Sequence, residues 1–229
     1  MDFTFNDDQL TFREAMSRFL MTEAAPEMLR EIWETDPGRS PELRGKLAEQ
    51  GLTALSVPED CGGLGMDDVA WSLMTQELGY YAIPDSLADT AYVSAGLIKA
   101  LPAGSHGREE LLGRIADGSV RIAIGHPVNP LVADAATADL LLLPHGDEVH
   151  LVPRALVDVT ANPSIDLSRR LASLAWEPSS ATRIAAGEAR TSSEQIFHRL
   201  WCAQTRNRRH SSQRRQKAIA IFSRRLCRC

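Results

Sequence analysis

Residues 47–83 read LAEQGLTALSVPEDCGGLGMDDVAWSLMTQELGYYAI, and this stretch decides the fold. It predicts a helix that ends at Gly51, where a residue without a Cβ can adopt the left-handed cap conformation. A breaker cluster with three glycines follows at 58–65. A second helix, 67–78, then begins, because an aspartate at its start is a favourable N-cap. The apolar face of this helix is expected to consist of Ala70, Trp71, Met74 and Leu78.

Composition is typical of a globular protein. The 229 residues are 44% hydrophobic and 24% charged, and they can bury a core in one large domain or two smaller ones. No apolar run approaches the roughly 20 residues that a membrane span requires. The first residues, MDFTFNDDQ, are acidic, unlike those of a secretory signal. We therefore expect a cytoplasmic protein without a membrane partner.

Six helices are predicted before residue 120, from apolar residues that recur at helical spacing and from local start signals. Asn6 with Gln9 forms a capping-box pattern for the first helix. Ser40, Asp85 and Ser105 are the expected start residues of three others. The remaining helices are expected at 26–34, 41–50, 67–78, 85–98 and 106–117.

The apolar period then changes from about 3.6 residues to 2, which predicts strands. The expected strands are 120–124, 138–143, Glu148–Val152, 156–160 and 171–176, with a tight turn at 144–147. Helices followed by strands indicate an α+β fold, in which an all-helical domain precedes a small, mainly antiparallel β domain. We expect these domains at 1–118 and 119–188, and a separate basic tail at 189–229.

The order of the short motifs resembles the N-terminal domain of the acyl-CoA dehydrogenase family. The motifs are Glu49-x-Gly51-Leu52, Val57-Pro58-Glu59, a G-G-x-G at 62–65 and an E-L-G at 77–79. Residues 1–20 also resemble the opening helix of the family. The resemblance is strong over 1–120, weaker over 121–188 and absent beyond, so the C-terminal helical domain of the family is missing.

The resemblance implies a flavoenzyme that uses FAD to remove two hydrogens from an acyl-CoA thioester, and a cofactor contact at Ile124, Gly125 and His126. Family members carry a Thr-Glu-Pro-like triplet at this strand end, and only Pro127 matches it. Gly125 stands for the hydroxyl residue and His126 for the acid. A glycine still offers its N–H to a flavin edge. The alternative is a plain strand end followed by a turn.

No catalytic residue is assigned, because neither Glu188 nor Glu194 lies in the motif that carries the general base of the family. No metal site is assigned either. His145 and His150 flank a predicted hairpin and are expected at the surface. Cys61 is interpreted as structural, since no base lies near it in sequence.

The tail at 189–229 differs sharply from the rest of the chain. It contains 11 Lys and Arg residues and a single acid, Glu194. Three interpretations stand: an arm for nucleic acid or an anionic membrane, a disordered tail, or a change of reading frame after about residue 188. The third is the one that we favour, and it predicts a truncated protein.

These observations leave three functional hypotheses. The first is an acyl-CoA dehydrogenase-like flavoprotein that is incomplete and inactive alone. It would form a homo- or hetero-oligomer with another acyl-CoA dehydrogenase-like subunit, as divergent small subunits of the family do. The second is a non-catalytic structural or partner subunit on the same fold. The third, a nucleic-acid binder, depends on the tail alone, and no nucleic acid is expected as a partner.

Overall fold

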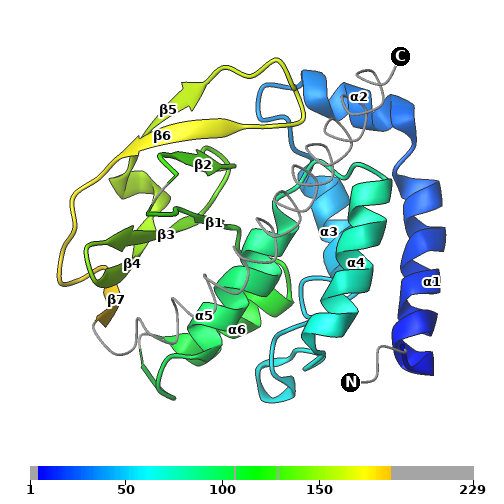
Figure 1. The fold of residues 1–229 in the computed structure, drawn as a ribbon, viewed down its shortest axis with the longest axis horizontal. Helices are drawn as coiled ribbons and strands as arrows, with labels where there is room; N and C mark the ends of the chain where they lie inside the picture. The colour runs from blue at the N-terminus through cyan, green and yellow to red at the C-terminus, as the bar shows by residue number, and fades with distance from the viewer. Residues whose placement is uncertain (1–4, 106, 128, 187–229) are drawn as a thin grey trace, which may run out of the picture.

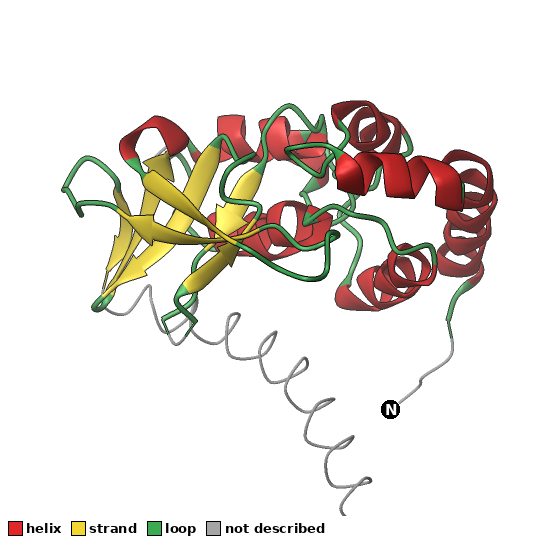
Figure 2. Cartoon of the chain, turned by 90° about the horizontal axis from the view of Figure 1, so that it is seen from above, coloured by secondary structure: helices red, strands yellow, loops and turns green. Residues whose placement is uncertain are grey.

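The structure is a computed structural model that describes residues 5–105, 107–127 and 129–186. Helices occupy one side of the molecule and strands the other (Figures 1 and 2). This confirms the predicted α+β fold, with a helical N-terminal region followed by a small β region. The predictions for the tail at 189–229, and those for Glu188, lie outside the described residues.

The helices follow the predicted order, and side-chain caps explain the starts of α1, α3 and α4. The α-helices are α1 (Asp7–Glu23), α2 (Pro26–Glu34), α3 (Pro41–Glu49), α4 (Asp68–Tyr80), α5 (Ala95–Lys99) and α6 (Arg108–Ala116). Asn6 and Gln9 form the predicted capping box at the start of α1. The side chain of Ser40 accepts the N–H of Leu43, and α3 begins there. Asp67 caps α4 in the same way, through the N–H of Ala70.

Two predicted helix starts are wrong. Asp85 does not cap a helix, because its carboxylate binds arginines that are distant in the sequence. The helical segment begins at Leu87, with the π-helix η2 (Asp89–Ser94) leading directly into α5. Ser105 is not the cap of α6 either; Gly107, at a φ of 65°, takes that position.

The helical core is built around Trp71, which is 2% exposed, as predicted from the helix register. Its ring lies 5.4 Å from that of Tyr92 on η2. Leu78 was expected to be buried, but it is only half-buried, because it lies near the end of α4 at the edge of this core. The glycine-rich loop between the helices includes the short 3-10 helix η1 (Glu59–Cys61).

The strands form two sheets. One has the order β1-β3-β4-β7 and the other β2-β6-β5. Their bounds are β1 (Ile122–Ile124), β2 (Leu131–Ala133), β3 (Leu140–His145), β4 (Glu148–Pro153), β5 (Asp158–Asn162), β6 (Leu171–Ala175) and β7 (Arg183–Ala186). The pair β1–β3 is parallel and the other pairs are antiparallel, which confirms a mainly antiparallel region.

Three details of the strands differ from the prediction. Strands β2 and β7 were not predicted, because each has only three or four residues and gains its hydrogen bonds from a distant partner. The strand predicted at 156–160 begins later, at Asp158, because the preceding residues form the 3-10 helix η3 (Arg154–Leu156).

A second core joins the helical and strand regions. It combines Ile98 and Leu112 from the helices with Ile122 and Leu142 from the strands. A third core lies between the two sheets. Residues before and after Gly118 therefore share one hydrophobic core. The division into domains at 1–118 and 119–188 stays a prediction.

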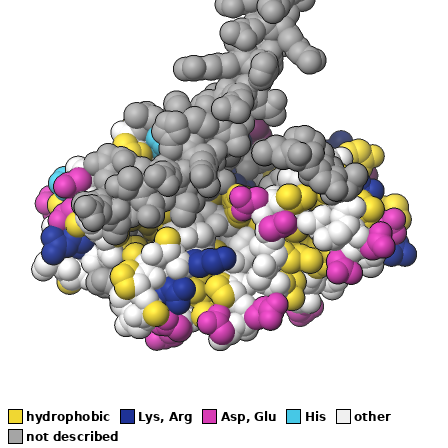
Figure 3. Space-filling view, turned by 60° about the horizontal axis from the view of Figure 1, so that its bottom comes forward, with side chains coloured by type: hydrophobic (Ala, Val, Ile, Leu, Met, Phe, Trp, Pro, Cys, Tyr) yellow, Lys and Arg dark blue, Asp and Glu magenta, His cyan; other side chains and the backbone are white. Residues whose placement is uncertain are grey.

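The face drawn in Figure 3 carries acidic side chains and some basic ones, with apolar side chains exposed between them. Over the described residues, none of the helices combines the length and the apolarity that a membrane span requires.

Candidate functional site

The end of strand β1 carries the predicted cofactor residues, and a helix holds this strand in place. The hydroxyl of Thr90, on η2, accepts the N–H of Ile122 at 2.9 Å and donates to its carbonyl at 3.1 Å. The strand pairs in parallel with β3, so that Ile124 lies opposite Leu142. Strand β1 is therefore held by η2 at Ile122 and by β3 along its length.

Gly125 is buried directly after the strand, where the side chain of Leu143 packs closely against it. A Cβ at this position would lie 2.8 Å from Cδ2 of Leu143, closer than carbon atoms approach without a shift. Its N–H donates to the carbonyl of Leu142 at 2.9 Å. The N–H of Gly125, which was predicted to contact a flavin, is therefore already bonded within the sheet.

His126 opens a tight turn in which the N–H of Asn129 donates to its carbonyl at 3.1 Å. The side chain of Asn129 then accepts the N–H of Leu131, at the start of β2. Partial burial lowers the pKa of His126, so the imidazole is neutral at pH 7. A neutral imidazole can donate one hydrogen bond and accept another, but it carries no charge.

A cluster of buried charges joins the helical region to the residues before β1 and after β2. The carboxylate of Asp85 binds Arg44 at 2.6 Å and Arg121 at 3.2 Å. Asp134, which follows β2, binds Arg39 through two hydrogen bonds of 2.9 and 2.5 Å. No local pattern in the sequence indicates these pairs, because the partners lie 36 to 95 residues apart.

Asp134 adopts a left-handed backbone conformation, with a φ of 56°. Its side chain also accepts the N–H of Ser86, and its own N–H donates to the carbonyl of Arg170. These contacts stabilise a conformation that is unfavourable for a residue with a Cβ. The turn after β2 is therefore fixed against both the helices and the second sheet.

Asp89 lies on η2 beside this cluster. Burial, together with the charges of Asp134 and Asp85, raises the pKa of Asp89 to about 7. No hydrogen bond or ion pair to its carboxyl group is found among the described residues. Its protonation therefore changes near neutral pH.

Two other sequence predictions have different outcomes. His145 is exposed as expected, but His150 is 1% exposed, so its predicted surface position is wrong. Its Nδ1 lies 3.0 Å from Oγ1 of Thr182, and its Nε2 lies 3.2 Å from a carboxylate oxygen of Glu148. The unpredicted strand β7 explains the error, because the segment that leads into it covers this histidine.

No cluster of metal-ligating side chains occurs in the part of the chain that the structure describes. Burial and the neighbouring Asp60 raise the pKa of the Cys61 thiol, which keeps it protonated at neutral pH. This agrees with a structural cysteine rather than a nucleophile.

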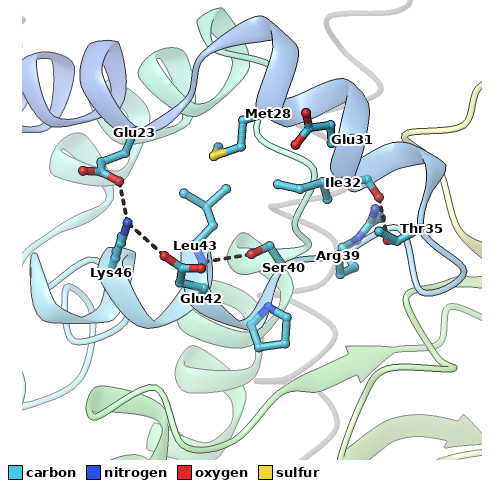
Figure 4. Close-up of a pocket in the computed structure, with 11 residues that line it drawn as sticks. Glu23, Met28, Glu31, Ile32, Thr35, Arg39, Ser40, Glu42, Leu43 and Lys46 are labelled. Carbon is cyan, nitrogen blue, oxygen red and sulfur yellow. Dashed lines mark hydrogen bonds and ion pairs between the residues drawn. The ribbon is translucent and has the colours of Figure 1, made fainter.

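A cavity of about 360 Å³ lies between the end of α1, α2 and the start of α3 (Figure 4). Lys46 bridges Glu23 at 2.7 Å and Glu42 at 3.1 Å along its edge. These pairs satisfy the lysine within the protein. The cavity is lined by none of the residues from Ile124 to His126, so it is separate from the predicted cofactor segment.

Comparisons with known proteins agree with the resemblance in the sequence. The family model described as "Acyl-CoA dehydrogenase, N-terminal domain" matches residues 6–119. Acyl-CoA dehydrogenase IpdE2 of Mycolicibacterium smegmatis is 30% identical over 172 residues, which are 74% of this chain and 52% of that protein. IpdE2 of Mycobacterium tuberculosis is 28% identical over 133 residues, 58% of this chain and 42% of that protein. The chain thus spans about half the length of the curated relatives that it matches.

Solved structures share the fold at lower identity. A variant of the Tcur3481–Tcur3483 steroid ACAD has a TM-score of 0.69 at 19% identity, covering 83% of this chain and 59% of that one. The ChsE4–ChsE5 complex of Mycobacterium tuberculosis has a TM-score of 0.69 at 18% identity, with 86% and 62% coverage. Butyryl-CoA dehydrogenase of Megasphaera elsdenii has a TM-score of 0.66 at 15% identity, with 86% and 63% coverage.

Proposed function

Because the chain belongs to the acyl-CoA dehydrogenase family, we propose that it is one subunit of a flavoprotein that dehydrogenates an acyl-CoA thioester. A second acyl-CoA dehydrogenase-like subunit would complete its active site. The observation that carries this proposal is the family match over residues 6–119, followed by the strand β1, which ends at the predicted cofactor segment. When bound, FAD accepts the hydride in such a reaction.

The strand end fits a single contact with FAD rather than a complete site. Gly125 has no side chain, and its N–H is bonded within the sheet. The polar side chain that this segment offers is the neutral imidazole of His126. We propose that Ile124, Gly125 and His126 form one wall of a shared flavin site, in which the imidazole hydrogen-bonds a polar edge of the ring.

Two structural relatives support a shared site. The ChsE4–ChsE5 complex and the Tcur3481–Tcur3483 steroid ACAD are each named for two components. A general base must lie within hydrogen-bond reach of the proton that it removes. Since no described carboxylate lies in the base motif of the family, we propose that the base comes from outside residues 5–186.

The alternative is a non-catalytic subunit that only supports its partner. The bond between Gly125 and Leu142 favours it, because this bond removes a backbone donor from the site. The two proposals differ in whether His126 touches the flavin.

The test is to replace His126 in a complex of this chain with an acyl-CoA dehydrogenase-like partner subunit. The first proposal predicts that His126→Ala weakens FAD binding by about tenfold, the effect of one lost hydrogen bond of ~1.4 kcal/mol. His145→Ala is the matched control, because His145 is exposed at the hairpin between β3 and β4. Equal FAD affinity in both variants would favour the non-catalytic subunit.

A further inference from the structure

A cleft of about 840 Å³ lies away from the cofactor segment, between the α2–α3 loop and the β5–β6 hairpin. The hairpin extends from the sheets towards α2 in Figure 1. Residues 33–37, at the end of α2 and in the loop after it, form one wall, and the strands β5 and β6 with their connection form the other. None of the residues from Ile124 to His126 lines it. A space of this volume is in the range of small-molecule sites.

Three arginines line this cleft: Arg154, Arg169 and Arg170. Within residues 5–105, 107–127 and 129–186, no carboxylate lies within 4 Å of their guanidinium groups. Partly buried charges normally have a counter-ion, because a low-dielectric environment penalises an unpaired charge. The cleft therefore has unpaired positive charge on its lining.

The protein holds Arg170 in a fixed position. Its guanidinium donates to the carbonyls of Trp33 at 2.7 Å, Thr35 at 3.0 Å and Leu167. Gly38 makes room for it, because a Cβ there would lie 2.5 Å from the guanidinium carbon. These bonds use three of the five N–H donors of an arginine and leave two for another acceptor.

Arg154 and Arg169 retain more of their donors. Arg154 makes one side-chain hydrogen bond, to the carbonyl of Val157 at 2.8 Å. Arg169 is exposed, and the carboxylate of the nearby Asp166 bonds Ser168 and forms no ion pair with it. A flexible exposed guanidinium can close over an anion that the two more buried arginines receive.

Acidic residues in the same walls do not cancel this charge. Asp134 is already paired with Arg39. Glu34 and Asp36 are exposed and also line the cleft without an ion pair among the described residues, so three unpaired arginines there outnumber two unpaired carboxylates. The remaining lining includes apolar side chains, among them Val159 and Leu171. Such a site combines a net positive charge with an apolar surface.

We propose that this cleft binds a small organic oxyanion, a carboxylate or a phosphate attached to an apolar body. The oxyanion would contact Arg169 and the free donors of Arg154 and Arg170, and the apolar body would lie against β5 and β6. The site requires neither flavin nor a partner subunit, so it stands apart from the proposed dehydrogenase function.

The test is isothermal titration of the full chain with benzoate, phenyl phosphate and inorganic phosphate, with benzyl alcohol as the uncharged probe. The proposal predicts saturable binding of benzoate or phenyl phosphate, which also tells a carboxylate site from a phosphate site. Benzyl alcohol should not bind, and inorganic phosphate should bind more weakly than phenyl phosphate, since it lacks the apolar body.

Arg169→Gln should weaken binding about tenfold, because one charge-assisted hydrogen bond is lost. The substitution leaves the described hydrogen bonds intact, so the fold is retained. Arg114→Gln is the control, since Arg114 is an exposed arginine on α6, outside the cleft. Absence of saturable binding by all three anions would overturn the proposal. Equal affinities of the Arg169→Gln and Arg114→Gln proteins would overturn it too.

Discussion

Trp71 shows how much a single side chain contributes to the helical core. It is 2% exposed and packs against Tyr92. We predict that Trp71→Ala lowers the free energy of unfolding by about 3–5 kcal/mol, because a large cavity replaces the ring. Urea denaturation measures this change. Tyr80→Ala is the control, since Tyr80 is 81% exposed on the same helix and should cost less than about 0.5 kcal/mol. Similar costs for both variants would contradict the assigned core.

The buried carboxyl group of Asp89 should make the stability of the fold depend on pH. Burial raises its pKa to about 7 in the folded state, from an ordinary value of 3.8. Between these two pH values the unfolded chain releases the proton while the folded chain keeps it. The stability that Asp89 contributes is therefore fully present below about pH 4 and is lost as the pH rises to about 7.

Asp89→Asn should remove this dependence and stabilise the protein at pH 8 by roughly 1–3 kcal/mol. Thermal unfolding across pH 4 to 8 compares the variant with the native chain. Asp147→Asn, in the exposed β3–β4 turn, should leave the pH profile unchanged. A native profile that stays parallel to that of Asp89→Asn would show that Asp89 does not titrate differently on folding.

At the scale of elements, the contact between η2 and β1 positions the cofactor segment. The Thr90 hydroxyl satisfies both the N–H and the carbonyl of Ile122. We predict that Thr90→Val costs about 1–3 kcal/mol, because it leaves buried backbone groups unpaired. It should also accelerate hydrogen exchange of the Ile122 amide.

Thr75→Val serves as the control for this contact. The Thr75 hydroxyl bonds only carbonyls of its own helix, α4, and the residue is exposed. Its replacement should change stability by less than about 0.5 kcal/mol. If exchange at Ile122 is the same in both variants, Thr90 does not hold the strand.

The elements also show what the sequence could predict. Helix starts at Asn6, Ser40 and Asp67 were predicted correctly, because a cap and its backbone partner lie three residues apart. Asp85 carries the same local signal, but two distant arginines bind it instead. Strands β2 and β7 pair with segments far along the chain. Each has only three or four residues, too few for an alternating apolar pattern to be recognised in the sequence.

The sequence predicted the strand that ends at Ile124, but not the hydrogen bonds around the candidate site. The assignment of Ile124, Gly125 and His126 to a cofactor contact comes from the family resemblance and stays a prediction. The bond from the Gly125 N–H to Leu142 follows from the parallel pairing of β1 with β3, which no local pattern indicates. The cleft with its three arginines was missed for the same reason, because α2 and the β5–β6 hairpin meet only in the folded chain.

At the scale of the whole molecule, the helical and strand regions are held together by one shared core and by buried ion pairs. Asp134 and Arg39 connect them at 2.5 Å, and both side chains are almost fully buried. This arrangement gives the end of β1 a fixed place relative to the helices. A fixed wall of this kind is what a binding site shared with another subunit requires.

The most direct test of the account is the flavin content and acyl-CoA-dependent flavin reduction of the purified chain, alone and in complex with an acyl-CoA dehydrogenase-like subunit. We predict that the chain alone retains no FAD and oxidises no acyl-CoA, because Gly125 and His126 offer too few contacts. The complex should be yellow and should be bleached by acyl-CoA. A 229-residue chain that holds FAD by itself and reduces it with an acyl-CoA would contradict the proposed shared site.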